Sequence, residues 1–168
     1  MNVADLLVDG FGRVREVVHQ AVGGLTAEQL AARPGPDANS IGWLAWHLAR
    51  VQDDHVADVA DTEQLWTAQD WHTRFGLPFP AEDIGYGHRS EDVAQVRPES
   101  PELLTGYYDA VHEHTLTWLA KLDEAALDRV VDKRWTPPVT LGVRLVSVLS
   151  DDLQHAGQAA YVRGLLLD

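Results

Sequence analysis

Hydrophobic residues recur at steps of three and four along four long stretches of the chain, and this spacing predicts four long helices. Gly23-Gly24 ends the first stretch. Asn39-Ser40 supplies good N-caps for the second, and Ser100-Pro101 places a cap before a proline at the first helical position of the third. The predicted helices cover residues 3–22, 41–61, 101–122 and 140–167.

Shorter elements are predicted between these helices. Thr26 and Gln29 resemble a capping box for a short helix, and Asp123-Glu124 resembles a cap for a second one. Residues 130–139 contain two consecutive prolines and are predicted to be extended or looped.

Helical periodicity is lost over residues 69–98, which form the longest connection in the chain. Glycine, proline and aromatic residues alternate there, so we expect an ordered covering loop and not a disordered linker. The pattern therefore predicts an all-α fold, an antiparallel four-helix bundle in a single domain over residues 1–168, with a long loop between helices 2 and 3.

Composition narrows the possible functions. The chain has 13 basic and 26 acidic residues, and its net charge of -13 argues against binding to nucleic acid or to anionic lipid. It has no cysteine, so any thiol chemistry must use a thiol supplied from outside. The N-terminus lacks the features of a signal peptide and no apolar run reaches membrane-spanning length, so we expect a soluble cytoplasmic protein.

Polar residues interrupt the apolar face of the last predicted helix. Asp151 and His155 are four residues apart, on one helical face, and continue the line set by Val148. Burying a carboxylate and an imidazole is costly unless they are paired, and a metal ion is one such partner. A hydrogen-bonded Asp–His pair and a solvated face are the alternatives.

The second predicted helix carries a further ligand type. His47 lies on its apolar stripe between Leu44 and Val51. With Asp151 and His155 it would provide three ligands and leave a fourth position open, as in catalytic zinc sites. His55 lies about 12 Å further along a straight helix at 1.5 Å per residue, too far to share that metal.

Two charged residues are candidates for supporting this site or binding substrate. Arg144, seven residues before Asp151, could steady that carboxylate or bind an acidic group. Asp54, seven residues after His47, could orient a ligand or pair with Arg144. A plain structural salt bridge is the alternative for both.

The remaining histidines are expected to be surface or satisfied residues, although His88 could line the site entrance. Trp66 is a candidate for an exposed apolar side chain, of the kind that a homodimer interface would use. The histidines concerned are His19, His55, His72, His88, His112 and His114.

Residues 39–48 (NSIGWLAWHL) and 151–158 (DDLQHAGQ) resemble the DinB/YfiT-like superfamily of metal-binding four-helix bundles. That family has one histidine on its second helix and a His-x-x-x-His pair on its last. His47 matches the first histidine and His155 the second of the pair, whereas Asp151 replaces the first of the pair. The resemblance implies a metal held by these residues; two histidines and a carboxylate suit Zn²⁺, and also Fe²⁺ or Ni²⁺.

Residues 7–11, 51–55 and 141–145 are most similar to the actinobacterial mycothiol S-transferase branch, and 11 arginines against 2 lysines agree with such a host. This resemblance implies a zinc-dependent enzyme that activates mycothiol as a thiolate and conjugates it to an electrophile, in detoxification. It also implies a possible homodimer. A mycothiol-dependent isomerase of the maleylpyruvate type and a non-enzymatic helical binding protein are the alternatives.

Overall fold

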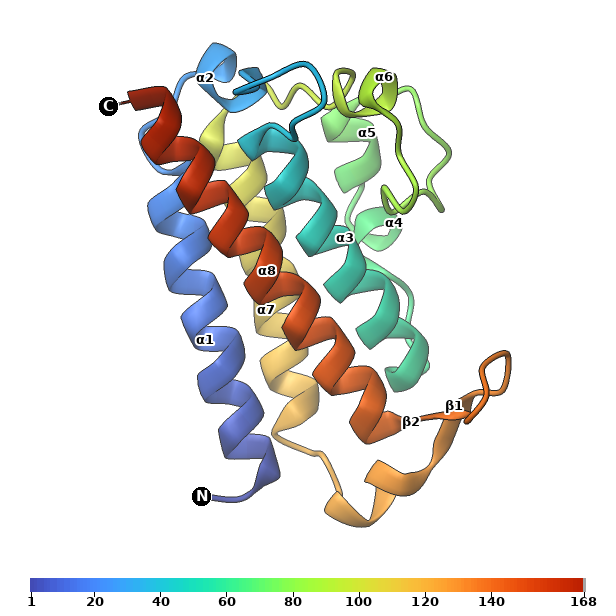
Figure 1. The fold of residues 1–168 in the computed structure, drawn as a ribbon. Helices are drawn as coiled ribbons and strands as arrows, with labels where there is room; N and C mark the ends of the chain where they lie inside the picture. The colour runs from blue at the N-terminus through green and yellow to red at the C-terminus, as the bar shows by residue number, and fades with distance from the viewer. Residues whose placement is uncertain (168) are drawn as a thin grey trace.

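Four long helices packed side by side form the body of the molecule in the computed structural model, which describes residues 1–167 (Figure 1). This confirms the predicted all-α four-helix-bundle fold, and Asp168, the end of the predicted domain, lies outside the described residues. The long helices are α1 (Val3–Val22), α3 (Ile41–Ala60), α7 (Pro101–Leu119) and α8 (Leu141–Leu167).

Local capping explains why these helices begin where the sequence indicates. The Ser40 hydroxyl accepts a hydrogen bond from the Trp43 backbone N–H, and the Ser100 hydroxyl accepts one from Leu103, ahead of the proline that opens α7. Asn2 forms a capping box with Asp5 at the start of α1. Each cap satisfies backbone donors that the first turn leaves without an intrahelical partner.

Seven shorter elements occupy the connections. The predicted short helix after Thr26 is present, and a 3₁₀ helix follows Asp123, as the caps indicated. Three helices between α3 and α7 were not predicted, because four or five residues are too few to show helical periodicity. The elements are α2 (Ala27–Ala31), α4 (Leu65–Ala68), α5 (Trp71–Phe75), α6 (Ser90–Val93), η1 (Glu124–Asp128), β1 (Val130–Asp132) and β2 (Val139–Thr140).

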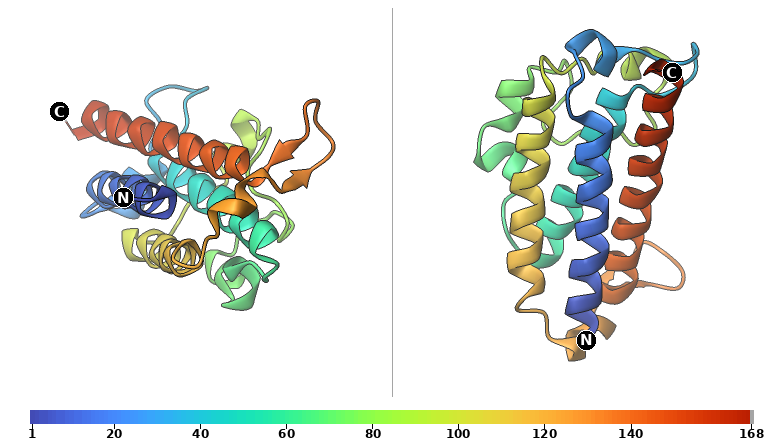
Figure 2. Two further views of the ribbon diagram at one scale, coloured as in Figure 1. Left: turned by 90° about the horizontal axis from the view of Figure 1, so that it is seen from below. Right: turned by 90° about the vertical axis from the view of Figure 1, so that its left-hand side faces the viewer.

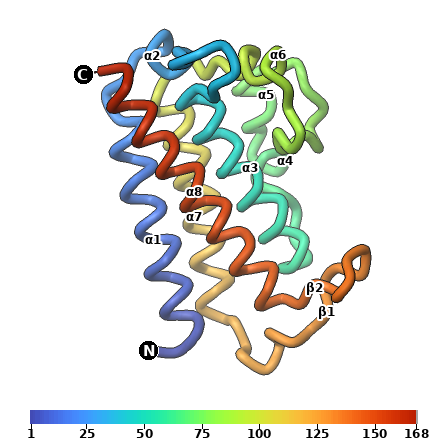
Figure 3. Tube along the Cα trace, viewed as in Figure 1, coloured from blue at the N-terminus to red at the C-terminus, as the bar shows by residue number. Residues whose placement is uncertain are grey.

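The segment predicted to be extended or looped contains the two strands, which pair as an antiparallel hairpin. Val130 lies opposite Thr140 and Asp132 opposite Val139, with an irregular register between the two pairs. The hairpin projects beside the start of α8 (Figures 1 and 3).

The helices are antiparallel within two neighbouring pairs and parallel within two others. The segment between α3 and α7 carries the chain back along the bundle, so both helices start at one end (Figure 2). At that end Gly42 packs against Pro98. At that same end α8 and α1 finish, and Arg163 donates to the carbonyl groups of Ala21 and Gly23. Around the bundle, α8 therefore packs between α3 and α1, with α7 opposite.

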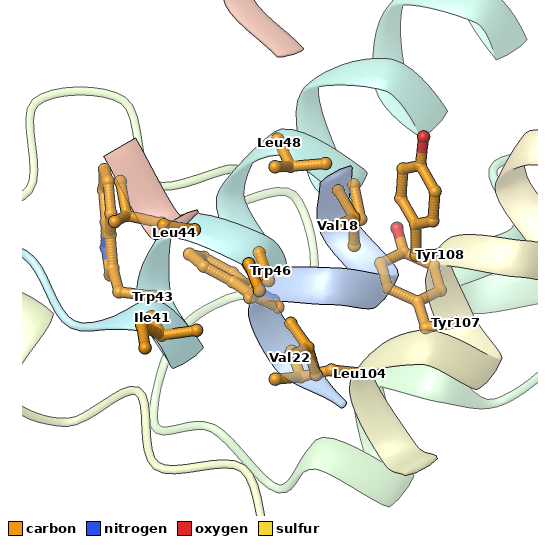
Figure 4. Packing of buried hydrophobic residues seen from close by; sticks show 14 of the residues in the cluster. Val18, Val22, Ile41, Trp43, Leu44, Trp46, Leu48, Leu104, Tyr107 and Tyr108 are labelled. Carbon is orange, nitrogen blue, oxygen red and sulfur yellow. The ribbon is translucent and has the colours of Figure 1, made fainter. Parts of the chain in front are cut away.

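The core consists of two apolar clusters along the bundle axis. The larger lies at the end where α3 and α7 begin, and Figure 4 shows Trp46 of α3 and Leu104 and Tyr107 of α7 among its side chains. Trp66 belongs to this cluster and is only 3% exposed, so the expectation that it is exposed was wrong. It is buried because the unpredicted α4 folds back and packs it against the rings of Trp46 and Tyr107. No helix among residues 1–167 is long and apolar enough to cross a membrane.

Candidate metal centre

His47, Asp151 and His155 come together where α3 packs against α8. One nitrogen or oxygen atom from each lies within 4.8 Å of the corresponding atoms of the other two, although the sequence separates them by about a hundred residues. His47 is buried, whereas the side chains of His155 and Asp151 are 17% and 35% exposed. The cluster is therefore closed on the α3 side and reaches solvent on the α8 side.

The His47 ring is held in one orientation. Its Nδ1 donates to the backbone carbonyl of Ile84, because a carbonyl can only accept, so Nε2 is left with its lone pair available. The ring also stacks on Trp43, with centroids 4.6 Å apart and planes 16° apart. Gly85 approaches closely at φ +87°, and a Cβ on it would lie 2.8 Å from His47 Nδ1. These contacts fix both the tautomer and the direction of the free nitrogen.

Asp151 and His155 also present free donor atoms. His155 Nδ1 lies 2.8 Å from Gln158 Oε1, so its Nε2 is the nitrogen that faces Asp151, 3.5 Å from Oδ1. The second oxygen of Asp151, Oδ2, is buried and has no hydrogen-bond partner among the described residues. Such an orphaned buried carboxylate oxygen fits a site whose natural occupant is a cation.

The pKa shifts in the cluster have opposing physical causes. Burial lowers the pKa of His47, against the smaller opposite effect of its hydrogen bond to Ile84. Burial also disfavours a charged His155, but hydrogen bonds with Asp151 and Gln158 raise the pKa of His155 overall. Burial favours a neutral Asp151, yet the neighbouring His155 lowers the pKa of Asp151 overall. A divalent cation requires a neutral imidazole and a charged carboxylate. The shifts of His47 and Asp151 favour these forms, whereas the raised pKa of His155 favours its protonated form in the absence of a cation.

Residues 81–88, the covering segment, hold the far side of His47 in place. Arg50 is fully buried and donates to the backbone carbonyl groups of Asp83 and Ala81, both at 3.2 Å. His88 accepts a hydrogen bond from Trp43 Nε1 at Nδ1 and donates from Nε2 to Asp83. His88 thus anchors this segment over the ring that stacks on His47. The contribution of Ile84 is a backbone carbonyl, which no side-chain pattern could reveal.

Arg144 and Asp54 do not form the contacts that helical spacing suggested. Among the described residues, Arg144 forms an ion pair with Asp132 at 3.0 Å, and neither Asp151 nor Asp54 pairs with it directly. Its second terminal nitrogen donates to His55 Nε2 at 3.3 Å, and His55 Nδ1 donates to Asp54 at 3.0 Å. The predicted pairs were wrong because the β1–β2 hairpin brings Asp132 against Arg144, and His55 lies between Arg144 and Asp54.

The fully buried carboxyl on α8 is Asp152, not Asp151. Val148 and Asp152 point into the core, whereas Asp151 lies beside that line and faces α3. Burial, followed by the negative charge of Asp151, raises the pKa of Asp152 well above its usual value. His112 was expected to be exposed or satisfied, but it is buried and its Nδ1 has no partner among residues 1–167.

Comparison with known proteins identifies the relatives of this architecture. The family model described as mycothiol-S-transferase matches residues 6–167. A crystal structure described as the conserved protein of locus from Enterococcus faecalis superimposes with a TM-score of 0.93 at 35% identity, over 99% of this chain and 98% of that one. The comparison with curated proteins found no match.

Proposed function

Because this chain belongs to the mycothiol-S-transferase family, we propose that it is a metal-dependent enzyme that transfers mycothiol, through its sulfur, to an electrophilic substrate. The proposal includes Zn²⁺ as the metal, His47, Asp151 and His155 as its ligands, and detoxification of reactive compounds as the role. One observation carries it: three donor atoms of suitable type lie within 4.8 Å of one another, and none is committed to a competing strong hydrogen bond.

The donor set fits a catalytic and not a structural metal. Two imidazole nitrogens and one carboxylate oxygen are common zinc ligands, and three protein ligands leave a position for a thiol. The same set accepts Fe²⁺ and Ni²⁺, so the donors alone favour no single one of the three. A bound Zn²⁺ would supply positive charge that lowers the pKa of a thiol and favours its thiolate, which is the nucleophilic form.

The residues of this chain provide position and shielding. His47 is fixed by Ile84 and Trp43, so its free nitrogen cannot rotate away from Asp151 and His155. The buried side of the cluster excludes water, while the partly exposed α8 side admits a thiol and an electrophile. In the reaction the thiol loses its proton, its sulfur forms a bond to the electrophilic carbon, and the displaced electron pair leaves with the leaving group.

The test compares two histidine variants of the purified protein without a histidine tag. His155→Ala removes a proposed ligand, whereas His72→Ala changes an exposed histidine on α5. We expect His155→Ala to lose stoichiometric metal and to conjugate mycothiol to monochlorobimane at least about 100-fold more slowly. Loss of a residue that only hydrogen-bonds to a metal ligand costs up to about 100-fold, and loss of the ligand itself should cost no less. His72→Ala should match the unmodified enzyme.

A His155→Ala enzyme with full metal content and a normal rate would refute the proposed ligand set. Replacing mycothiol by bacillithiol in the same assay tests the thiol, and we expect mycothiol to be preferred. An enzyme that reacts with neither thiol would refute the proposed activity while leaving the metal analysis intact.

A further inference from the structure

The outward face of α8 carries an apolar stripe that no other element among residues 1–167 covers. Figure 1 shows α8 in front of α1 and α3 with this face open. The stripe repeats at steps of three and four over 25 residues, which is the heptad spacing of helices that pack against another helix. Its members are Val143, Val146, Ser150, Leu153, Gly157, Ala160, Gly164 and Leu167.

The large side chains of this face are in solvent in the single chain. Leu153 and Val146 are 47% and 63% exposed, and Tyr161, which flanks the stripe, is 69% exposed. Six large apolar side chains lie on or beside the stripe, and at roughly 100 Å² each they present on the order of 600 Å² to solvent. Two copies packed through this face would bury about 1,200 Å², which is the lower limit for a stable interface.

Charge favours a second copy of this chain as the partner. The net charge of -13 makes two copies repel each other over most of their surfaces. No member of the stripe is charged, so two copies can approach there without contact between like charges. The charged residues of α8 all lie off the stripe; they are Arg144, Asp151, Asp152 and Arg163.

The order of large and small residues fits an antiparallel pair of these helices. With a two-fold axis at the level of residue 155, Val146 lies opposite the partner's Gly164, and Leu153 lies opposite the partner's Gly157. Each large side chain then meets a small residue, as in well-packed cores. A parallel pair would instead place leucine against leucine and leave a gap between the glycines. Antiparallel helices also oppose their dipoles favourably.

The surface of α8 already has the shape that this pairing needs. A hollow of about 480 Å³ is lined by Ala160, Tyr161, Gly164 and Leu165, the place that the partner's Val146 would fill. A Cβ added to Gly157 would meet nothing within 4 Å, so the space for the partner's Leu153 is open as well.

We propose that this chain forms a symmetric antiparallel homodimer through the outward stripe of α8. Each copy supplies both the large and the small residues, so the same patch serves on both sides of the interface. The interface needs neither the metal nor the thiol cosubstrate, and it does not involve Trp66, which is buried.

Sedimentation equilibrium tests the dimer directly. The unmodified chain, with or without Zn²⁺, should have twice the chain mass at about 100 µM. Leu153→Glu should weaken dimerisation at least about 100-fold, because the symmetry places two glutamates in each interface. Tyr86→Glu is the matched control, since Tyr86 is 89% exposed and lies off α8, and it should leave the dimer intact.

Two results of this experiment would overturn the proposal. One is a chain that stays monomeric, including a monomer that binds phosphatidylcholine vesicles through this face instead. The other is equal weakening of the dimer in Leu153→Glu and Tyr86→Glu.

Gly157→Leu separates the interface from the stability of the fold. Leucine forms helices better than glycine and has open space here in the single chain, so the variant should raise the urea midpoint of the monomer. The same leucine would collide with the partner's Leu153 and weaken dimerisation about tenfold or more. Gly12→Leu on α1, also with open space, should raise the midpoint and leave dimerisation unchanged. A dimer of normal affinity in Gly157→Leu would overturn the proposed contact.

A spin label tests the antiparallel arrangement. The chain has no cysteine, so Val143→Cys provides a unique attachment point. In the proposed dimer Val143 lies opposite the partner's Leu167, 24 residues further along α8, so the two labels should be about 36 Å apart along the helix axes. A parallel pair would bring them to about 10 Å, and that separation would overturn the antiparallel dimer.

Discussion

Gly85→Ala tests whether the covering segment holds His47 in its orientation. Gly85 has φ +87°, and an added Cβ would lie 2.8 Å from His47 Nδ1 and 2.9 Å from the Trp46 ring. Neither neighbour can move freely, because His47 is bonded to Ile84 and Trp46 is buried in the core. Gly87 is the matched control, since it has φ +77° but nothing within 4 Å of an added Cβ.

The two substitutions share one energetic cost and differ in another. Forcing alanine into a left-handed backbone conformation costs about 1–2 kcal/mol, and this cost is common to both variants. Gly85→Ala adds overpacking against His47 and Trp46, which costs about 1–3 kcal/mol. We therefore expect Gly85→Ala to lower the free energy of unfolding by about 2–5 kcal/mol, and Gly87→Ala by about 1–2 kcal/mol.

The functional consequence is measured separately from stability. Displacing His47 from its hydrogen bond should weaken Zn²⁺ binding by about 10–100-fold in Gly85→Ala and leave it unchanged in Gly87→Ala. Urea unfolding of the metal-free proteins gives the stabilities, and competition with a fluorescent zinc chelator gives the affinities. Equal zinc affinity in the two variants would show that the segment around Gly85 does not orient His47.

Two further predictions concern stability. Asp53 is fully buried and accepts hydrogen bonds from two backbone N–H groups that begin α4 and from a buried tyrosine, so Asp53→Ala should cost about 3–5 kcal/mol in urea unfolding. Asp54 is partly exposed, so Asp54→Ala should lower the free energy of unfolding by about 1 kcal/mol or less. A similar loss in the two variants would contradict this account. Partial burial opposes ionisation of Asp109, but hydrogen bonds from His19 and Arg15 lower the pKa of Asp109 overall. The charged Asp109 carboxylate therefore stabilises the folded protein above the unfolded pKa of about 3.9, and this stabilisation is lost as the pH falls further. The difference in the free energy of unfolding between the unmodified protein and Asp109→Asn should shrink below about pH 4.

The long helices could be predicted from sequence because their signals are local. Each is long enough to repeat its apolar stripe several times, and caps such as Ser40 and Ser100 mark where they begin. The short helices near Trp66 lack this repetition, and they form because packing against α3 and α7 buries their aromatic residues. Propensity alone does not determine such segments.

The candidate metal ligands were predicted from helical spacing, since polar groups on an apolar face need a partner. Their support was not predictable. Ile84 acts through its backbone, and Asp132 reaches Arg144 only because a hairpin folds back onto α8. The sequence pattern predicts that Asp151 points into the core, whereas the structure buries Asp152 there. Adjacent helical positions differ by about 100°, which is no more than the width of an apolar face, so the pattern alone does not decide between the two residues.

The distance in sequence between His47 and His155 has a consequence for folding. More than a hundred residues separate them, and the connection between α3 and α7, α7 itself and the hairpin all precede α8, which docks on α3. Contacts between such remote segments pay a large loop-closure entropy and form late. If His47, Asp151 and His155 are the ligands, as proposed, a metal ion could therefore be held by all three only after α8 has docked on α3.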